Sequence, residues 1–158
     1  MTYAFMSLFA AFIVAADQIS KYFVSHHMAL YESRTLIPGV VELYYVRNSG
    51  MAWSLLSGAR WFFVGITVAL LALLVVVIWK KMFTKKFELF CLAAIIGGAI
   101  GNFIDRLLYG EVIDMINVTF IDFPVFNVAD CFVTCGAILL VVYILIFDRK
   151  DKRNDSAK

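Results

Sequence analysis

Three short blocks between residues 97 and 130 gather the side chains of this chain that can do chemistry. Residues 97–106, 110–114 and 126–130 lie within or next to strongly apolar segments. Together they hold three aspartates, one arginine and two asparagines: Asn102, Asp105, Arg106, Asp114, Asn127 and Asp130. Burying such groups in apolar surroundings is costly, so each of them needs a partner or a function.

Asp114 and Asp130 are the two carboxyl groups that we expect to work as a pair. Two carboxylates close together cannot both ionise easily, so they share one proton. One can then take a proton from water while the other donates a proton to a carbonyl oxygen or a leaving amine. This predicts peptide hydrolysis without a metal ion, a cofactor or a covalent intermediate. Four further polar residues can orient the substrate or the carboxylates: Asn48, Asn102, Arg106 and Asn127.

Each aspartate alone has a simpler interpretation. Asp130 falls in the first turn of a predicted helix, where a carboxylate satisfies backbone N–H groups and the helix dipole. Asp114 alone is an ordinary turn residue. The combination favours catalysis, because the chain has no Gly-x-Ser-x-Gly or His-Glu-x-x-His motif and no placed Ser/Lys couple.

The composition indicates a membrane protein. Of the 158 residues, 63% are hydrophobic and 16% are charged, whereas soluble domains have about 45–50% and about 25%. We predict one all-α membrane domain over residues 1–158. Four apolar runs have about the length that crosses a bilayer: residues 3–24, 61–79, 87–108 and 128–147.

The links between these helices differ in character. In residues 25–60, Pro38-Gly39 marks a turn, and the β-branched and aromatic residues at 41–46 predict a short strand. We therefore expect a small β-like extracytoplasmic segment on the membrane surface between the first two helices. Residues 109–127 are predicted to form a polar link that contains turns and carries no Lys or Arg.

Basic residues set the predicted orientation. Nine of the fourteen Lys and Arg lie in residues 80–86 and in a tail at 148–158. The positive-inside rule puts both of these segments and both termini in the cytoplasm. Asn48, Asp114 and Asp130 then meet at the opposite membrane face. The basic clusters flank apolar runs and lack interleaved aromatic residues, so they indicate topology and not nucleic-acid binding.

Asp17 and Lys21 lie four residues apart within the first apolar run, so they share a helix face and can pair. Snorkelling at the interface would explain Lys21 but not Asp17. A purely structural pair and direct contact with the site both remain open. The spacing Gly97-x-x-x-Gly101 predicts a small-residue face on the third helix, where another backbone can approach closely.

Three cysteines, Cys91, Cys131 and Cys135, lie in apolar surroundings and are predicted to be small buried residues. Cys131 and Cys135 are four apart on one face of the fourth helix. No metal-ligand spacing joins the cysteines to the histidines, and no disulfide framework is indicated.

Five blocks together resemble the lipoprotein signal peptidase family, also called signal peptidase II. They occur in the family's order and spacing, and the four-helix pattern spans essentially the whole chain. The blocks are Asp17-Gln18-x-x-Lys21, Asn48–Trp53, Gly97–Arg106, Val112–Asp114 and Phe126–Asp130.

The resemblance implies an aspartic endopeptidase of the bacterial cytoplasmic membrane. We expect it to be a monomer surrounded by membrane lipids. Its substrates would be prolipoproteins whose lipobox cysteine carries diacylglycerol, cut just before that cysteine near the extracytoplasmic face. Asp114 and Asp130 would be the catalytic pair. Matching positions that support the site or contact substrate would be Asp17, Lys21, Asn48, Gly98, Asn102, Arg106 and Asn127.

Three other functions compete with this one. A small ion- or proton-coupled transporter would use Asp17, Asp105 and Arg106 as a relay. Transporters usually place the key carboxylate near the bilayer midplane, whereas Asp114 and Asp130 lie at predicted helix ends. A membrane assembly factor would use the glycine face. A presenilin-like protease would need both aspartates within helices and a Gly-x-Gly-Asp motif, whereas Glu111-Val112-Ile113 precedes Asp114.

Overall fold

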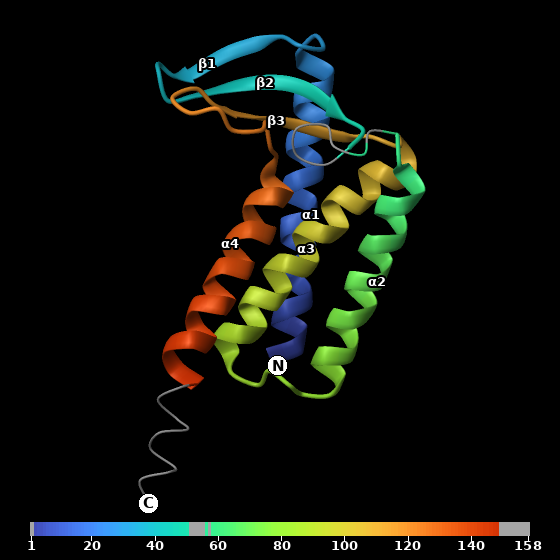
Figure 1. The fold of residues 1–158 in the computed structure, drawn as a ribbon, viewed down its shortest axis with the longest axis vertical. Helices are drawn as coiled ribbons and strands as arrows, with labels where there is room; N and C mark the ends of the chain where they lie inside the picture. Colours follow the sequence, from blue (N-terminus) through green and yellow to red (C-terminus); the bar gives the residue numbers. More distant parts are fainter. Residues whose placement is uncertain (1, 51–55, 57, 149–158) are drawn as a thin grey trace, which may run out of the picture.

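The computed structural model describes residues 2–50, 56 and 58–148. Four long helices occur in this part of the chain (Figure 1): α1 (Thr2–His27), α2 (Arg60–Trp79), α3 (Lys86–Leu108) and α4 (Val128–Tyr143). A π-helical turn, η2 (Ile144–Asp148), continues α4. All four predicted helices are confirmed, and α1 runs three residues beyond its predicted end. The predictions for Met51–Trp53 and for the tail beyond residue 148 lie outside the described residues.

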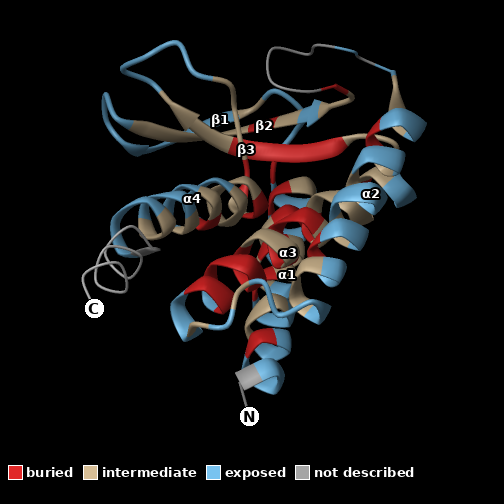
Figure 2. Cartoon of the chain, turned by 60° about the horizontal axis from the view of Figure 1, so that its bottom comes forward, coloured by how far each residue is buried: buried red, intermediate tan, exposed pale blue. Residues whose placement is uncertain are grey.

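The helices expose large apolar side chains on their outer surfaces, as contact with lipid requires. Leu8, Trp61, Leu73 and Ile138 are each more than half exposed. All four helices are long and apolar enough to cross a membrane, the fourth when α4 is taken together with the turn that continues it to Phe147. α3 is the most buried of them and packs against α1, α2 and α4 (Figure 2). The protein core is therefore built around α3.

Glycines let α3 approach its neighbours closely. A Cβ atom on Gly97 would lie 2.9 Å from the carbonyl oxygen of Ala10 in α1. A Cβ atom on Gly98 would overlap the carbonyl oxygen of Ala129 in α4. The predicted small-residue face is thus confirmed, and it includes Gly98 as well as Gly97 and Gly101. These contacts bring α1, α3 and α4 together just below the polar side chains.

A three-stranded antiparallel sheet lies across one end of the helices (Figure 1). Its strands are β1 (Ser33–Ile37), β2 (Val41–Asn48) and β3 (Val112–Val118), in the order β1-β2-β3. The strand predicted at residues 41–46 is confirmed as part of β2. A buried apolar cluster joins the sheet to the end of α1: Val24, Met28, Tyr45, Ile113 and Met115.

The prediction for residues 109–127 was wrong in part. We expected a polar link with Asp114 at the end of a turn, but residues 112–118 form β3, which pairs with β2 along its length. The segment Val112-Ile113-Asp114-Met115-Ile116-Asn117-Val118 is rich in β-branched residues, which favour strands. The sheet therefore draws its third strand from the link between α3 and α4, and this strand carries Asp114 into the structure.

Candidate active site

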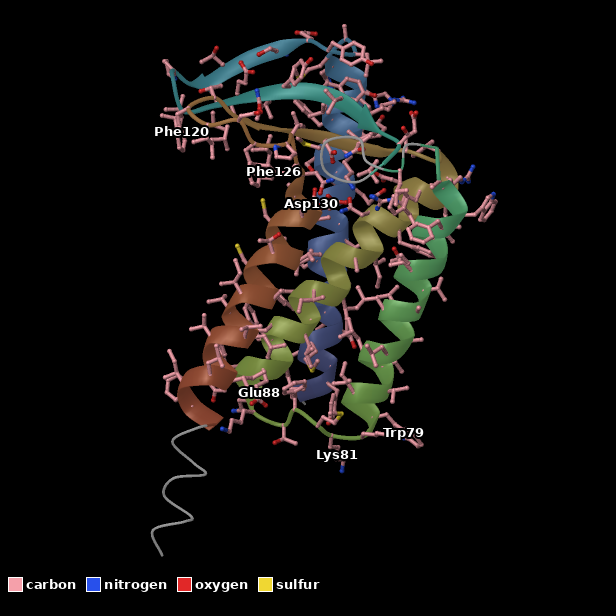
Figure 3. The ribbon with its side chains drawn as sticks, in the orientation of Figure 1. Trp79, Lys81, Glu88, Phe120, Phe126 and Asp130 are labelled. Atoms are coloured by element: carbon pink, nitrogen blue, oxygen red, sulfur yellow. The ribbon has the colours of Figure 1, made fainter. Side chains whose placement is uncertain are left out.

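Asp114 and Asp130 come from two different kinds of element. Asp114 lies in the middle of β3, where Val46 of β2 is its cross-strand partner. Asp130 lies in the first turn of α4, at the end of the helix that faces the sheet (Figure 3). Its Oδ2 accepts a hydrogen bond from the backbone N–H of Asn127 at 3.2 Å. The capping role considered for Asp130 is therefore real, but it occupies only one of the two carboxylate oxygens.

Side-chain amides connect the two carboxyl groups. Asn127 Nδ2 donates to Asp114 Oδ1 at 2.7 Å and to Asn102 Oδ1 at 3.0 Å. Asn102 Nδ2 in turn donates to the other carboxylate oxygen of Asp130, Oδ1, at 2.8 Å. Asn48 Nδ2 donates to Asp114 Oδ2 at 3.0 Å. The three asparagines that we predicted to orient the carboxyl groups therefore each contact Asp114 or Asp130. All four carboxylate oxygens of these two aspartates accept a hydrogen bond.

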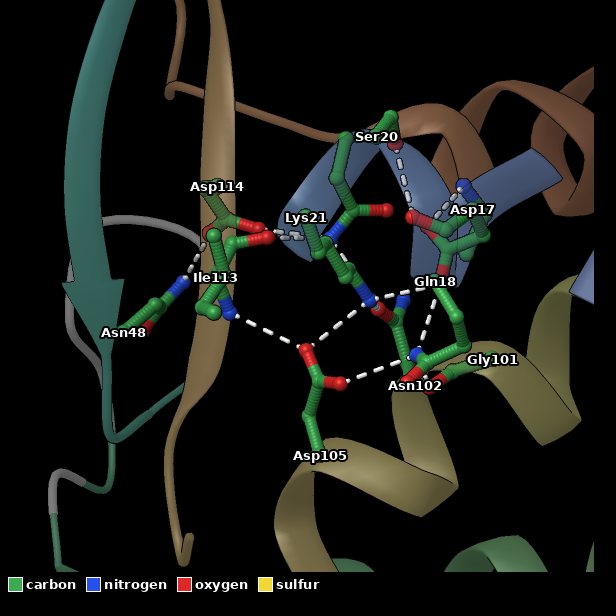
Figure 4. A network of polar contacts seen from close by, with 12 residues as sticks. Asp17, Gln18, Ser20, Lys21, Asn48, Gly101, Asn102, Asp105, Ile113 and Asp114 are labelled. Atoms are coloured by element: carbon green, nitrogen blue, oxygen red, sulfur yellow. Dashed lines mark hydrogen bonds and ion pairs between the residues drawn. The ribbon is translucent and has the colours of Figure 1, made fainter. Parts of the chain in front are cut away.

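Behind these amides lies a buried group of charges (Figure 4). Lys21 Nζ lies 2.8 Å from Asp17 Oδ2 and 3.0 Å from Asp105 Oδ2, and no more than 2% of any of these three residues is exposed. Lys21 also donates to Asn102 Oδ1 at 2.9 Å. Asp17 and Lys21 do form a pair, and Lys21 reaches the site through Asn102 rather than contacting either aspartate of the pair.

Backbone contacts connect this charged group to both elements that carry the aspartates. Asp17 Oδ1 accepts from the backbone N–H of Ala129 in α4 at 2.9 Å. Asp105 Oδ2 accepts from the backbone N–H of Ile113 in β3 at 3.1 Å. A Cβ atom on Gly101 would lie 2.5 Å from Asp17 Oδ2, so only glycine leaves room here. The group therefore fixes the positions of β3 and α4 relative to α1 and α3.

Our candidate site residues did not include Asp105 or Gln18. Gln18 Nε2 donates to Asp105 Oδ1 at 3.0 Å and to the carbonyl oxygen of Gly101 at 3.1 Å. Both residues stand inside sequence blocks that carry the family resemblance. Their polarity within apolar helices was the available signal, but their partner across the helix interface was not visible in the sequence.

Arg106 lies apart from Asp105, as the angle of about 100° between successive helix residues leads one to expect. Its guanidinium stacks over the Phe63 ring at 5.0 Å and donates a long hydrogen bond of 3.4 Å to the carbonyl oxygen of Gly50. These two contacts do not use all five N–H donors of the guanidinium. Arg106 is therefore placed to bind a carbonyl or carboxylate oxygen in the space that it lines.

That space is a cavity of about 470 Å³. Its polar end is lined by Asn48, Asn102, Arg106, Asp114 and Asp130. Most of the rest is lined by residues 123–126, which precede α4, and by three residues on one face of α4: Cys131, Thr134 and Cys135. The cavity therefore joins a pair of carboxyl groups to a largely apolar wall.

The exposure of the cysteines differs from our prediction. Cys91 is fully buried in α3, as expected, but Cys131 is half-buried and Cys135 is exposed. The helix packing explains the difference, because α4 buries its glycine-bearing face against α3 and leaves the face with these two thiols toward the cavity.

Asp114 holds a proton more tightly than an ordinary aspartate. Burial, and after it the neighbouring Asp130 carboxylate, raise the pKa of its carboxyl group to about 7, against the lowering effect of the hydrogen bonds from Asn48 and Asn127. One neutral and one ionised carboxyl group can therefore coexist near neutral pH, which is the state that general acid–base catalysis by such a pair requires.

Comparison with known proteins gives consistent matches. The family model described as signal peptidase (SPase) II matches residues 9–146. A lipoprotein signal peptidase of Streptococcus pyogenes serotype M6 is 45% identical over 130 residues, which cover 82% of this chain and 86% of that protein. A lipoprotein signal peptidase of Listeria welshimeri serovar 6b is 41% identical over 142 residues, which cover 89% of this chain and 92% of that protein.

Two solved structures share the fold. One, described as "Bacterial membrane enzyme structure by the in meso method at 2.3 A resolution", has a TM-score of 0.87 and 38% sequence identity, and covers 96% of this chain and 91% of that chain. A second, at 1.9 Å resolution, has a TM-score of 0.84 and 38% identity, and covers 91% and 94%. Both the sequence and the fold therefore match over most of the chain.

Proposed function

Since this chain belongs to the signal peptidase II family, we propose that Asp114 and Asp130 carry out its reaction as an aspartic pair. The family membership makes the chain a membrane peptidase that removes signal peptides from prolipoproteins. The aspartic mechanism rests on one observation above all. Both carboxyl groups line the same cavity, and a continuous set of amide hydrogen bonds connects them.

In this mechanism the pair holds one proton, which we place on Asp114. Burial raises the pKa of Asp114. Asp130 is half-buried as well, but the N-terminus of α4 and the backbone N–H of Asn127 stabilise a negative charge there. Asp130 takes a proton from a water molecule, whose oxygen attacks the scissile carbonyl carbon. Asp114 donates its proton to the carbonyl oxygen. Asp130 then passes its proton to the leaving amine as the C–N bond breaks, and a hydroxyl of the tetrahedral intermediate returns a proton to Asp114.

The neighbouring polar groups have positioning roles in this proposal. Asn48, Asn102 and Asn127 fix the carboxyl groups through the hydrogen bonds described above. Arg106 binds a carbonyl oxygen of the substrate, either of the peptide or of its lipid ester. The ion pair of Asp17 and Lys21, together with Gly98 at the contact between α3 and α4, fixes the positions of the helices that surround the site.

The substrate that fits this cavity is a diacylglyceryl-modified prolipoprotein, cut just before the lipidated lipobox cysteine. The acyl chains would lie along the apolar wall formed by residues 123–126 and α4. The scissile bond would lie at the polar end. A lipid-bearing cysteine can enter such a cavity sideways from the bilayer, so that the peptide bond never leaves the interface.

We place the chain in the bacterial cytoplasmic membrane as a monomer, with both termini in the cytoplasm and the sheet on the extracytoplasmic side. Four helices suited to cross a membrane support a multi-pass protein. Lys81 and Glu88 lie at the end of the helices opposite the sheet, whereas Asp130 lies next to the sheet (Figure 3). The basic link between α2 and α3 is therefore far from the candidate active site, which supports this orientation.

The proposal is tested with purified protein and a diacylglyceryl-modified prolipoprotein peptide in detergent. We expect Asp114→Asn and Asp130→Asn to lower turnover by about 10²–10⁴-fold, because each removes a group that moves a proton. Asp122→Asn is the matched control, because Asp122 is exposed outside the cavity. The same peptide without lipid should be a poor substrate for the unaltered enzyme.

Folding of each variant is checked by its elution volume and thermal unfolding. A folded Asp114→Asn variant that cleaves as fast as Asp122→Asn would exclude Asp114 from the reaction. Equal cleavage of the lipidated and unlipidated peptides would refute the assignment of the apolar wall to acyl chains.

A further inference from the structure

Two thiols in the candidate active-site cavity have no part in the proposed mechanism. Cys131 and Cys135 are free cysteines four residues apart on α4, and both line the cavity that holds Asp114 and Asp130. Thr134, between them on the helix, lines it too, so this face of α4 is turned to the cavity. The remaining cysteine, Cys91, is fully buried in α3.

The spacing of the two thiols suits a ligand that binds both of them. Cβ atoms four residues apart on a helix are neighbours, about 5–6 Å from each other. The two side chains can therefore converge on one atom placed between them. Cys131 also directly follows Asp130 in the first turns of α4. A ligand held by both thiols would fill the cavity beside the carboxyl pair.

The number of ligands at this place determines which thiophilic species can bind. Zinc and similar divalent ions are held by three or four protein ligands. Within the described residues, no group of three or more His, Cys, Asp or Glu side chains could hold a metal ion. A trivalent arsenic atom that already carries one organic substituent needs only two sulfur atoms to complete its coordination.

We propose that Cys131 and Cys135 form a dithiol site for monosubstituted trivalent arsenicals, and that its occupation closes the catalytic cavity. In the reaction of an arsine oxide, R–As=O, two As–S bonds form and the As=O bond breaks. The oxygen leaves as water with the two thiol protons, and no atom is oxidised or reduced. The loss of turnover rests on the proposed function, whereas formation of the adduct does not.

The apolar wall of the cavity favours this reaction over ordinary alkylation. Alkylating reagents react with the thiolate, which an apolar environment disfavours. The arsenical exchange begins and ends with neutral species, so a low dielectric does not oppose it. An aryl substituent on arsenic can also enter from the lipid phase and pack against the apolar residues 123–126.

The experiment treats the purified protein with phenylarsine oxide and measures the adduct by intact mass after gel filtration. The unaltered chain and Cys91→Ser should each retain one phenylarsenic group. Cys131→Ser and Cys135→Ser should each lose it, since a single thiol does not hold arsenic through the filtration. Retention of the adduct by either of these two variants would overturn the site.

Turnover of the lipidated peptide is measured on the same samples. It should fall in proportion to the fraction of protein that carries the adduct, and return when a competing dithiol removes the arsenic. Full turnover by protein that carries the adduct would overturn the claim that the cavity is closed. Asp114→Asn should take up the arsenical like the unaltered chain, so the site is tested even if the protein cleaves no peptide.

Discussion

At the scale of single residues, the main feature of this site is the way each amide is oriented. Lys21 has only donors to offer, so the atom of Asn102 that faces it must be the carbonyl oxygen Oδ1. The Nδ2 group of Asn102 then necessarily faces Asp130. The same oxygen accepts from Asn127, which thereby directs its own Nδ2 group at Asp114 as well. One buried ammonium group therefore sets the hydrogen-bond direction at both carboxyl groups.

The first residue-scale prediction concerns Lys21. Lys21→Met leaves Asp17 and Asp105 buried without their counter-charge, and we expect the free energy of unfolding to fall by about 3–5 kcal/mol. Lys21→Met/Asp105→Asn should recover part of this loss, because it removes one of the two uncompensated carboxylates. Lys80→Met, at an exposed position, is the control. Denaturant unfolding in detergent measures all three, and equal stability of Lys21→Met and Lys80→Met would contradict the prediction.

The second residue-scale prediction concerns pH. The pKa of Asp114 in the folded protein is about 7, against about 3.9 in an unfolded chain. Turnover should therefore fall as the pH rises through about 7 and the proton of Asp114 is lost. Between about pH 4 and pH 7 the folded state binds more protons than the unfolded state, so stability should also fall with rising pH in this window.

Asp114→Asn cannot ionise, so the fall in stability between pH 4 and pH 7 should be smaller in this variant. Thermal unfolding at a series of pH values gives the comparison. The difference in pH dependence is the informative quantity, because the substitution also changes hydrogen bonds with Asn48 and Asn127 at every pH. Parallel curves for the two proteins would show that Asp114 titrates normally.

The sequence was informative about these residues because polar side chains in apolar helices are costly and therefore stand out. That signal, with the family resemblance, was enough to single out Asp17, Lys21 and the two aspartates of the pair. It did not show that Asp105 joins Asp17 around Lys21, because the three residues come from two helices far apart in the sequence. Contacts across a helix interface leave no periodic pattern in either helix.

At the scale of elements, the geometry of the proposed catalytic pair depends on the contact between α3 and α4. Gly98 lies against the backbone of Ala129, the residue directly before Asp130. The position of Asp130 therefore follows from the closest approach of the two helices. Helix lengths could be predicted from apolar runs, whereas β3 was missed because its pairing with β2 joins residues about 70 positions apart. Strand pairing over such a separation is decided by tertiary contacts and not by local sequence.

The element-scale prediction uses two helical glycines with different surroundings. Gly98→Ala should lower the stability by about 1–3 kcal/mol, as overpacking does, and should lower turnover because α4 moves away with Asp130. Gly65→Ala in α2 is the matched control, because nothing lies within 4 Å of its added Cβ atom. It should be neutral or more stable by about 0.5–1 kcal/mol. Equal effects of the two substitutions on turnover would disprove a positioning role for the close contact.

At the scale of the whole molecule, the proposed function has the sheet and the helices contact different parts of the substrate. The helices expose apolar side chains to lipid, and the sheet covers their end next to Asp130 (Figure 3). Phe120 lies at the outer end of the sheet, beyond α4, in the same view. The cavity thus lies where the sheet meets the membrane helices, so a peptide bond at the membrane surface and acyl chains in the bilayer can reach it together.

The last prediction tests the orientation that this division requires. Ser33 on β1 and Thr84 in the link between α2 and α3 are both exposed, at opposite ends of the molecule. In a chain whose three cysteines are replaced by serine, Ser33→Cys should react with a membrane-impermeant maleimide in intact spheroplasts. Thr84→Cys should react only after permeabilisation, because the positive-inside rule places a link with basic residues on the cytoplasmic side. Labelling of Thr84→Cys in intact spheroplasts would show that the protein has the opposite orientation. Its carboxyl pair would then lie on the cytoplasmic side, where the proposed extracytoplasmic cleavage cannot occur.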